Sequence, residues 1–352
     1  MRYILPAEWY PQSGIQLTWP HEGTDWRPYL SDITKTFVEI VCDIVRFEKV
    51  LIVTPSTEIV EEALRGFIPD DLRKRVIIHE CDTNDTWARD HGVITLLPDT
   101  EDYRKGIQQD DALLLDFRFN GWGEKFPAAL DNQITSHLCE RKAFHGTRIS
   151  HDDFVLEGGS IESDGKGTIF TTSQCLLAIH RNQPLNRKGI ERQLIKRLHA
   201  QRIVWLDHGN LLGDDTDGHI DTILRIAPND TLLYVKSGNE NDPQHADFQA
   251  LERQLQSILT IEGKPYRLLP LPMPDAIYDD GERLPATYAN FLVLNEAVLC
   301  PTYAQPHHDG IALQTIAAAF PHREIIPIDA RTIIRQHGSI HCLTMQYPIG
   351  VI

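Results

Sequence analysis

Short apolar runs rich in β-branched residues alternate with longer segments of helical period along this sequence. Eight runs have the length and composition of strands: Val50–Val53, Arg75–His79, Ala112–Phe119, Gly167–Thr171, Arg202–Leu206, Thr231–Val235, Phe291–Leu294 and Glu324–Ile328. Four segments predict helices: Tyr29–Phe47, Asn186–Leu198, His245–Leu259 and Gly310–Phe320, the last ending before Pro321. In the first helix, apolar residues spaced three and four apart form one face: Leu30, Ile33, Phe37, Val41 and Ile44. Strands that alternate with helices favour an α/β fold.

No linker or low-complexity stretch divides the 352 residues. The most polar region, residues 99–111, is predicted to be a loop between two strands. No strict repeat is present, but loosely similar strand–helix units in one domain explain the pattern economically. We therefore expect a single domain over residues 1–352.

The chain has 34 Lys and Arg against 50 Asp and Glu, a formal net charge of −16. Such an excess repels nucleic acid and anionic lipid and concentrates cations, so neither nucleic acid nor a membrane is an expected partner. No apolar run approaches the ~18 residues of a membrane-spanning helix. The N-terminal segment lacks the long apolar core of a secretory signal, which makes a cytoplasmic location the expectation.

Six cysteines are scattered along the chain and form no Cys-x-x-Cys pair: Cys42, Cys81, Cys139, Cys175, Cys300 and Cys342. This spacing argues against a zinc ribbon, a thioredoxin-type motif and a dense disulfide framework. Most of them are expected to be small buried apolar residues. One of them could serve as a nucleophile.

Polar side chains and glycines follow several of the apolar runs, which is where α/β folds place binding groups. The segments of interest contain Asp82, Asp85, Trp87, Arg89 and Asp90; Asn120 to Gly123, with Trp122; Glu157 before Gly158 and Gly159; Asp217, His219 and Asp221; and Gly338, Ser339, His341 and Cys342. Each has a simpler explanation when taken alone. Asp85 or Asp90 could cap a helix or pair with Arg89, and Cys342 could be a core residue. The adjacent His307 and His308 are expected in a solvated loop.

Taken together, a Cys, a His and several carboxylates near turn glycines suit one chemical task, the binding and opening of a guanidinium group. A guanidinium is a planar cation with several N–H donors, which carboxylates grip through charge-assisted hydrogen bonds. Resonance makes its carbon a poor electrophile. A thiolate attacks such a carbon far better than water does.

The order of the motifs resembles the agmatine deiminase and Porphyromonas-type peptidylarginine deiminase family of guanidine-modifying enzymes. The matching segments run along nearly the whole chain: Ala7–Trp9, Thr18–Pro20, Asn84–Asp90, Phe119–Gly123, Leu156–Ser160, Gly218–Asp221 and Ile340–Thr344. This resemblance implies a five-bladed α/β propeller, the pentein fold, with pseudo-fivefold units and the active site on the central axis. It implies no metal and no organic cofactor.

Site residues carry over from the resemblance one by one. Cys342 matches the nucleophile, His219 the general acid/base, and Glu157 the carboxylate that supports the histidine and a substrate nitrogen. Asp90 and Asp221 match the carboxylates that grip the guanidinium. Trp87, Trp122 and Asp85 match residues that line the substrate pocket.

The resemblance predicts hydrolytic deimination through a covalent thiouronium on Cys342, with a small cationic guanidino compound as the partner. Agmatine is the first expected substrate, peptidylarginine the second, and an amidinotransferase or a non-catalytic guanidine-binding protein remains an alternative. Two loops depart from the agmatine-specific pattern, at His91–Val93 and at Gln336–Ile340, so the substrate tail could differ. Carboxylates around the Cys342 thiol predict a raised pKa in the free enzyme. The oligomeric state stays open.

Overall fold

A repeated arrangement of two antiparallel strands followed by a helical crossover to a parallel strand organises the chain. A computed structural model describes residues 2–105 and 111–352. Within these residues, five mixed sheets of three or four strands share the arrangement. A two-stranded hairpin, β14 (Tyr278–Asp279) with β15 (Glu282–Arg283), accompanies them.

The strand bounds follow the order of each sheet. The first sheet joins both ends of the chain: β19 (Thr344–Pro348), β2 (Gln12–Thr18), β3 (Lys49–Thr54) and β4 (Val76–Glu80). The second contains β1 (Tyr3–Ile4), β5 (Ile94–Pro98), β6 (Leu113–Arg118) and β7 (Thr147–Val155). The other three are β8 (Ile161–Ser163), β9 (Thr168–Thr172) and β10 (Arg202–Leu206); β11 (Leu224–Ala227), β12 (Thr231–Lys236) and β13 (Arg267–Pro272); and β16 (Leu292–Val293), β17 (Ala297–Thr302) and β18 (Glu324–Asp329).

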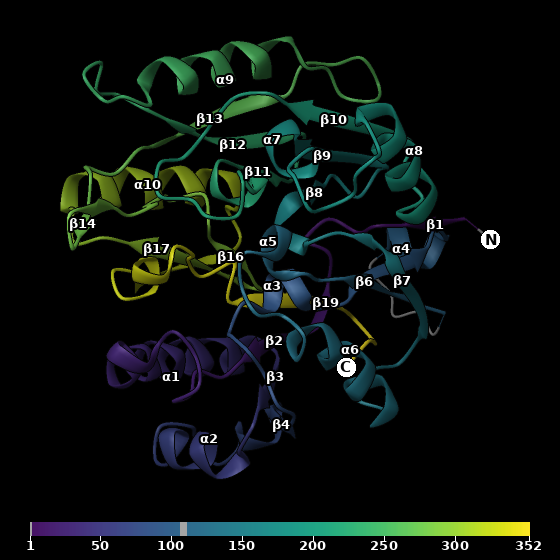
Figure 1. Ribbon diagram of the computed structural model, residues 1–352, viewed down its shortest axis with the longest axis vertical. Helices are drawn as coiled ribbons and strands as arrows, with labels where there is room; N and C mark the ends of the chain where they lie inside the picture. The colour runs from purple at the N-terminus through teal and green to yellow at the C-terminus, as the bar shows by residue number, and fades with distance from the viewer. Residues whose placement is uncertain (1, 106–110) are drawn as a thin grey trace.

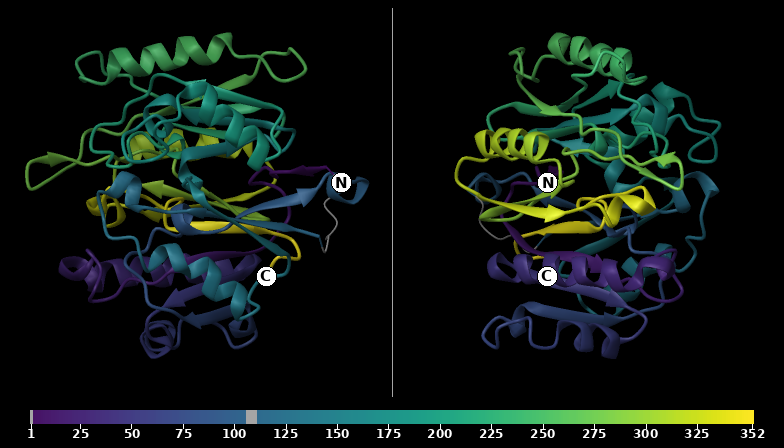
Figure 2. Two further views of the ribbon diagram at one scale, coloured as in Figure 1. Left: turned by 45° about the vertical axis from the view of Figure 1, so that its right-hand side comes forward. Right: turned by 90° about the vertical axis from the view of Figure 1, so that its left-hand side faces the viewer.

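The longer helices lie on the outside of the molecule, whereas the short helices α3 (Ala88–His91) and α5 (Gly121–Glu124) lie near its middle (Figure 1). The helices are α1 (Leu30–Phe47), α2 (Thr57–Leu64), α3 (Ala88–His91), α4 (Glu101–Arg104), α5 (Gly121–Glu124), α6 (Asp131–Glu140), α7 (Ser173–Leu176), α8 (Arg187–Arg197), α9 (His245–Ser257) and α10 (Pro306–Ala319). Short 3₁₀ turns are η1 (Arg27–Tyr29), η2 (Arg73–Arg75), η3 (Gly158–Ser160), η4 (Ile220–Thr222) and η5 (Ile333–Gln336). Figure 2 shows α9 at one end of the molecule and α1 with α2 at the opposite end.

All eight predicted strands are confirmed, with bounds that differ by at most a few residues. The predicted helices are confirmed as α1, α8, α9 and α10. In α1, the residues Ile33, Phe37, Val41 and Ile44 are fully buried, as the periodicity predicts. Asn186 caps α8, because its side chain accepts a hydrogen bond from the backbone N–H of Gly189.

Two local predictions are wrong. Helix α10 begins at Pro306, four residues before the predicted start, so His307 and His308 lie in a helix and not in a loop. Proline at the first helical position is favourable, since its missing N–H has no partner there in any helix. The predicted loop over residues 99–111 contains the short helix α4, capped by Thr100, which accepts a hydrogen bond from the N–H of Tyr103. Residues 106–110 of that loop lie outside the described residues.

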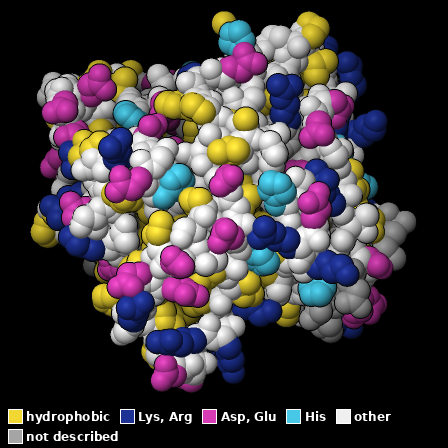
Figure 3. Space-filling view, turned by 60° about the horizontal axis from the view of Figure 1, so that its bottom comes forward, with side chains coloured by type: hydrophobic (Ala, Val, Ile, Leu, Met, Phe, Trp, Pro, Cys, Tyr) yellow, Lys and Arg dark blue, Asp and Glu magenta, His cyan; other side chains and the backbone are white. Residues whose placement is uncertain are grey.

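The six cysteines are all unpaired, and Cys81, Cys175, Cys300 and Cys342 are buried. Among the described residues, no helix is both long and apolar enough to cross a membrane. On the face drawn in Figure 3, acidic side chains are interspersed with basic ones, and several acidic side chains gather near its middle. Charges of both signs are therefore mixed on that face.

Candidate active site

A narrow pocket of about 380 Å³ lies where α3, α5 and the segment before β19 approach one another. Cys342 lines it and is only 5% exposed. The other lining residues are Asp25, Asp85, Trp87, Asp90, Trp122, Phe126, Asp215, Thr216, Gln336, His337 and Gly338. Five of the eight predicted site residues therefore line one pocket, although up to 257 positions separate them in the chain.

Cys342 is held by Asn290, which lies two residues before β16. The backbone N–H of Cys342 donates to Asn290 Oδ1 at 3.2 Å, and Asn290 Nδ2 donates to the Cys342 Sγ at 3.2 Å. The same sulfur lies 3.6 Å from Asp221 Oδ2. Burial, together with the carboxylates of Asp221 and Asp90, raises the pKa of the Cys342 thiol well above its ordinary value. This direction agrees with the expectation from the sequence.

Asp90 lies in α3, in the segment that follows β4, and both of its carboxylate oxygens are occupied. Oδ1 accepts a hydrogen bond from the Gly159 N–H at 3.0 Å, and Oδ2 accepts one from the Trp122 indole at 2.9 Å. Burial raises the pKa of Asp90 to about 6, although the nearby His219 lowers it. The carboxylate is thus fixed in orientation and mainly ionised at neutral pH.

An unusual turn places Trp122 against Asp90. Gly121, Trp122, Gly123 and Glu124 have φ angles of 68°, 55°, 83° and 67°, all in the left-handed region. Side chains with a Cβ disfavour this region, so a tryptophan and a glutamate there carry backbone strain. The Asn120 side chain stabilises the turn by accepting a hydrogen bond from the Gly123 N–H.

Asp221 is fully buried and is oriented by His341, the neighbour of Cys342. His341 Nδ1 lies 2.7 Å from Asp221 Oδ2, and its Nε2 lies 2.6 Å from Glu8 Oε1. Glu8 also pairs with Arg225 and with Arg89. Burial would raise the pKa of Asp221, but the hydrogen bond and charge of His341 hold it below the usual value. The second oxygen, Asp221 Oδ1, has no hydrogen-bond partner among the described residues.

His219 is fully buried beside Asp90, with its Nδ1 3.6 Å from Asp90 Oδ1. Neither of its ring nitrogens has a hydrogen-bond partner in the described part of the chain. Burial acts to lower the pKa of His219, but Asp90, the Cys175 sulfur and Glu157 raise it well above the ordinary value. These neighbours therefore favour the imidazolium form of His219 next to the pocket.

Glu157 precedes η3, and two glycines follow it because there is no room for side chains. A Cβ on Gly158 would lie 2.2 Å from the Arg89 carbonyl oxygen, and one on Gly159 would lie 2.6 Å from His219 Nδ1. Glu157 Oε1 accepts a hydrogen bond from Arg181 Nε at 3.0 Å. Oε2 has no partner among the described residues, although the side chain is fully buried.

Asp85 and Trp87 form one wall of the pocket. The Trp87 indole donates to Asp85 Oδ2 at 3.0 Å. The ring lies so close to Gly338 that a Cβ there would come within 2.1 Å of it. Burial raises the pKa of Asp85 to about 7, with hydrogen bonds from Thr86 and Trp87 acting in the opposite direction.

The structure contradicts the two simpler explanations for Asp85 and Asp90, which were helix capping and pairing with Arg89. Asp85 and Asp90 are not helix caps, since Trp87 occupies the N-cap position of α3. Arg89 pairs with Glu8, at 3.2 Å, and not with either aspartate. His219, Glu157 and Asp221 lie behind the pocket wall and do not line it, yet they surround Asp90 and Cys342.

Sequence reasoning missed Asn290. It directly precedes the apolar run 291–294, whereas the predicted polar groups all follow such runs. A search of the sequence for polar residues directly before each apolar run would have found Asn290. His341 and Arg181 were also missed as organising residues, because only the tertiary contacts reveal them.

Comparison with known proteins identifies the family of the chain. The model of the Porphyromonas-type peptidyl-arginine deiminase family matches residues 4–348. A Legionella pneumophila protein, provisionally named an agmatine deiminase, is 34% identical over 98% of this chain and 95% of its own length.

Three solved structures superpose on nearly the whole chain. A Porphyromonas gingivalis protein, provisionally named an arginine deiminase, has 45% identity and a TM-score of 0.91, covering 100% of both chains. A Campylobacter jejuni agmatine deiminase variant, with a serine in place of one cysteine and substrate bound, has 35% identity and a TM-score of 0.88, covering 99% of this chain and 97% of its own. The Enterococcus faecalis agmatine deiminase has 26% identity and a TM-score of 0.85, with coverage of 98% and 96%. The chain therefore belongs to the Porphyromonas-type peptidyl-arginine deiminase and agmatine deiminase family of guanidino-group hydrolases.

Proposed function

We propose that this protein is an agmatine deiminase, which hydrolyses agmatine to N-carbamoylputrescine and ammonia. The observation that carries the proposal is a set of buried polar atoms without partners around Cys342 in the described structure: both nitrogens of His219, Asp221 Oδ1 and Glu157 Oε2. Buried polar atoms are normally satisfied. A guanidinium supplies N–H donors in a plane, which matches carboxylate acceptors around the sulfur.

The first half of the reaction forms a covalent intermediate. A guanidinium held by Asp90 and Asp221 adds positive charge next to Sγ and lowers the pKa of the thiol, so the proton of Cys342 passes to solvent. The thiolate attacks the guanidinium carbon and forms the S–C bond. His219 gives its proton to one amino group, the C–N bond breaks, and ammonia departs. A thiouronium cation remains on Cys342.

The second half regenerates the enzyme. The now neutral His219 takes a proton from water, and the resulting hydroxide equivalent attacks the thiouronium carbon. The C–S bond breaks as the added hydroxyl group loses its proton, and a neutral ureido product leaves. The sulfur takes up a proton again, which restores the Cys342 thiol and leaves His219 protonated. The positive charge persists through both halves, which explains carboxylates at Asp90, Asp221 and Glu157 in place of an oxyanion hole.

The outer part of the pocket favours a substrate with a cationic tail. Asp25, Asp85 and Asp215 line it in addition to Asp90, and no Lys or Arg is among the described lining residues. Agmatine carries an amine at the end opposite its guanidinium and has no carboxylate. Free arginine has an α-carboxylate, which these acidic residues would repel.

A second candidate is deimination of arginine or of arginine in peptides. It is favoured by the name of the matching family model and by that of the 45% identical P. gingivalis protein. The acidic lining of the pocket favours agmatine over this second candidate. We also propose the five-bladed propeller and the cytoplasmic location that the sequence predicts. The five similar mixed sheets support the five blades.

One experiment tests the proposal. The protein is incubated separately with agmatine, L-arginine and peptides bearing internal or C-terminal arginine, and ammonia and ureido product are measured. We expect agmatine to have the highest kcat/KM, and Cys342→Ala to abolish product. A higher kcat/KM with an arginine peptide would assign the second function. Transfer of the amidino group to an added amine would indicate an amidinotransferase.

Matched variants test the tail site. Asp25→Asn and Asp215→Asn should each raise the KM for agmatine, since each removes a charge from the outer pocket. Asp82→Asn is the control, because Asp82 is exposed and does not line the pocket. An unchanged KM in both pocket variants would show that the tail is recognised elsewhere.

A further inference from the structure

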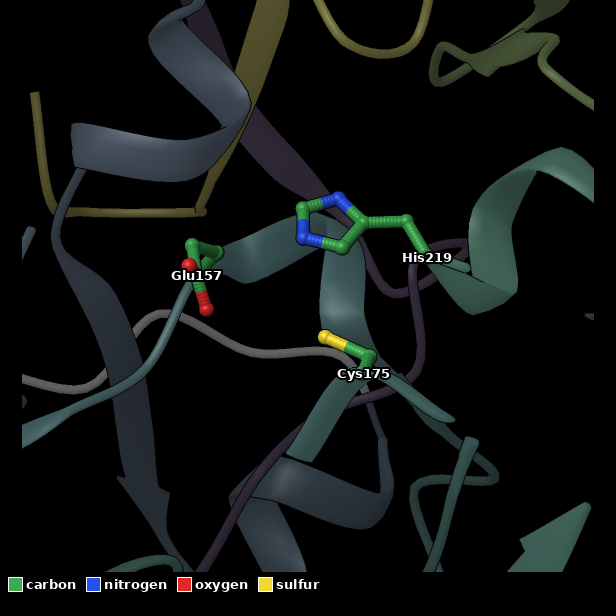
Figure 4. A group of neighbouring side chains, drawn as sticks. All are labelled: Glu157, Cys175 and His219. Carbon is green, nitrogen blue, oxygen red and sulfur yellow. The ribbon is translucent and has the colours of Figure 1, made fainter. Parts of the chain in front are cut away.

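Behind the pocket, Glu157, Cys175 and His219 form a cluster of potential metal ligands. One donor atom from each lies within 4.8 Å of those from the other two, and all three side chains are buried. They come from three elements: Glu157 precedes η3, Cys175 lies in α7 and His219 precedes η4. Figure 4 shows the three side chains pointing toward one another.

Within the described residues, the imidazole nitrogens of His219 and one carboxylate oxygen of Glu157 have no hydrogen-bond partner. His219 Nδ1 lies toward Asp90, and the imidazole ring as a whole faces Glu157 and Cys175 (Figure 4). Arg181 occupies Glu157 Oε1 and leaves Oε2 without a partner. A buried carboxylate oxygen and a buried imidazole nitrogen without partners are unfavourable, and a cation would satisfy both.

The charges around the cluster favour a cation. The carboxylates of Asp90 and Asp221 approach it from the side of Gly159, where the missing side chain leaves His219 Nδ1, Asp90 and Asp221 around one space. Arg181 is the neighbouring cation, but it is already paired with Glu157 and with Asp217, at 2.6 Å.

A second cluster of similar donors shows what a satisfied site looks like. Glu8, Glu162 and His341 also lie within 4.8 Å of one another. There, Arg225 pairs with both glutamates and His341 bonds to Glu8, so these groups already have cationic or hydrogen-bonding partners. Of these two clusters in the described structure, only the one with Cys175 combines a sulfur donor with unoccupied facing atoms.

We propose that Glu157, Cys175 and His219 bind a thiophilic divalent cation, Zn²⁺, which inhibits the enzyme reversibly. Thiolate, imidazole and carboxylate are the ligands that Zn²⁺ prefers, whereas Mg²⁺ and Ca²⁺ select oxygen ligands. Binding displaces the proton of the Cys175 thiol and that of the His219 imidazolium, and it leaves a fourth position for water. Only the inhibition rests on the proposed function. When His219 binds the metal, it can no longer act as the general acid/base of that reaction.

Co²⁺ replaces Zn²⁺ as a visible probe of metal binding, independent of activity. The Cys342→Ala protein is used so that the predicted nucleophile cannot bind the metal. We expect a thiolate-to-cobalt charge-transfer band with one equivalent of Co²⁺, and no such band when Cys175→Ser is added. The matched control is Cys81→Ser, because the Cys81 Sγ lies 3.1 Å from His137 Nδ1 and forms another Cys–His pair. A band that is absent in Cys342→Ala, or that is lost with Cys81→Ser and not with Cys175→Ser, overturns the proposal.

Inhibition and crystallography complete the test. In the protein with Cys342 intact, Cys175→Ser should raise the Zn²⁺ concentration for half-inhibition by at least about tenfold. Substitution of a residue that only supports a metal ligand already lowers metal affinity by about this factor, so loss of a ligand should have at least the same effect. Equal sensitivity would show that Zn²⁺ inhibits without Cys175 and would overturn the proposed inhibition. If Cys175→Ser does not fold, anomalous diffraction from Zn²⁺-soaked Cys342→Ala crystals decides, with ligand distances of about 2.0–2.3 Å expected. Agmatine hydrolysis is measured separately, on the protein with Cys342 intact. A metal signal in Cys342→Ala without hydrolysis by the intact protein would retain the site and refute the proposed function, whereas hydrolysis by the intact protein without a metal signal would do the reverse.

Discussion

Asn290 contacts Cys342 twice, once through the backbone and once through the sulfur. Its amide oxygen accepts from the Cys342 N–H and its amide nitrogen donates to Sγ, both at 3.2 Å. One side chain thus fixes both the position of the residue and the direction of its thiol. A hydrogen bond to sulfur also stabilises the thiolate over the thiol.

The first prediction concerns this pair. Asn290→Ala should lower kcat by about 10- to 100-fold, because a hydrogen bond to a charged group contributes about 1.5–3 kcal/mol. The KM for agmatine should change much less. Steady-state kinetics measure both, with the exposed Asn241→Ala as the control. An unchanged kcat in a folded Asn290→Ala protein would leave the contact with a structural role only.

The second prediction concerns the nucleophile. Cys342→Ala and Cys342→Ser should lose activity by more than about 100-fold, at least ~3 kcal/mol in barrier, while binding of agmatine persists. Calorimetry measures the binding and ammonia release the turnover. Cys42→Ala, at a half-buried cysteine that does not line the pocket, should retain full activity. Activity above a hundredth of the original in Cys342→Ala would exclude the assignment.

The third prediction concerns the carboxylates that surround the guanidinium. Asp90→Asn and Asp221→Asn keep the shape of the side chain but remove its charge, so kcat/KM should fall by about 100-fold or more, roughly 3 kcal/mol of transition-state stabilisation. Asp82→Asn should be nearly silent, since Asp82 is exposed. Equal losses at all three positions would mean that only the overall acidic field matters.

The fourth prediction follows from the raised pKa of Cys342. In the free enzyme the thiol is protonated at neutral pH, so iodoacetamide should react slowly there and faster at every step from about pH 6 to about pH 10. A haloacetamidine should react much faster at neutral pH, because its amidinium mimics the substrate cation between Asp90 and Asp221. Inactivation rates with both reagents measure the difference. Fast, pH-independent alkylation below pH 7 would reveal a preformed thiolate.

The fifth prediction concerns stability and the buried residue Glu48. Burial raises its pKa to about 7 from 4.5, although a hydrogen bond from Asn295 and the charges of Arg323 and Arg75 lower it. For an acid with a raised folded-state pKa, the neutral form is favoured in the fold. The resulting stability is complete below about pH 4.5, the unfolded-state pKa, and is lost as the pH rises through about 7.

Glu48→Gln should therefore stabilise the protein at pH 8, by at most about 3 kcal/mol, and have little effect near pH 5. Urea unfolding at the two pH values measures the difference. Glu240→Gln, at an exposed position, should show no such pH dependence. Equal effects of Glu48→Gln at both pH values would contradict a raised pKa in the fold.

Local patterns were sufficient for eight strands and for the four longest helices of the described residues. The runs that became β3, β6, β9 and β12 combine apolar and β-branched residues, and the face of α1 follows the helical period, so nearest-neighbour chemistry specifies them. The start of α10 was missed because Pro306, His307 and His308 have no apolar period, although proline is favourable at the first position of a helix. Strands with mixed composition, such as β7, were also not predicted, because their pairing partners stabilise them.

The residue types of the site were present in the sequence, and the resemblance assigned each a provisional role. Cys342, His219, Asp90, Asp221 and Glu157 could be chosen because a thiol, an imidazole and carboxylates beside glycines suit a guanidinium. The contacts that each of these residues makes could not be predicted from the sequence. Distances between residues over a hundred positions apart depend on how the sheets pack, and that is a property of the whole chain.

The sequence by itself thus determined the α/β class, the acidic character and the chemistry available to the site. Only the tertiary structure decided that Asn290 holds the sulfur, that His341 orients Asp221, and that Cys175 lies beside His219 and Glu157. The physical reason is that secondary structure arises from neighbours in the chain, whereas burial, hydrogen bonding and pKa shifts arise from neighbours in space. Cys175 and Cys342 are both buried cysteines, and their surroundings alone distinguish a proposed metal ligand from a proposed nucleophile.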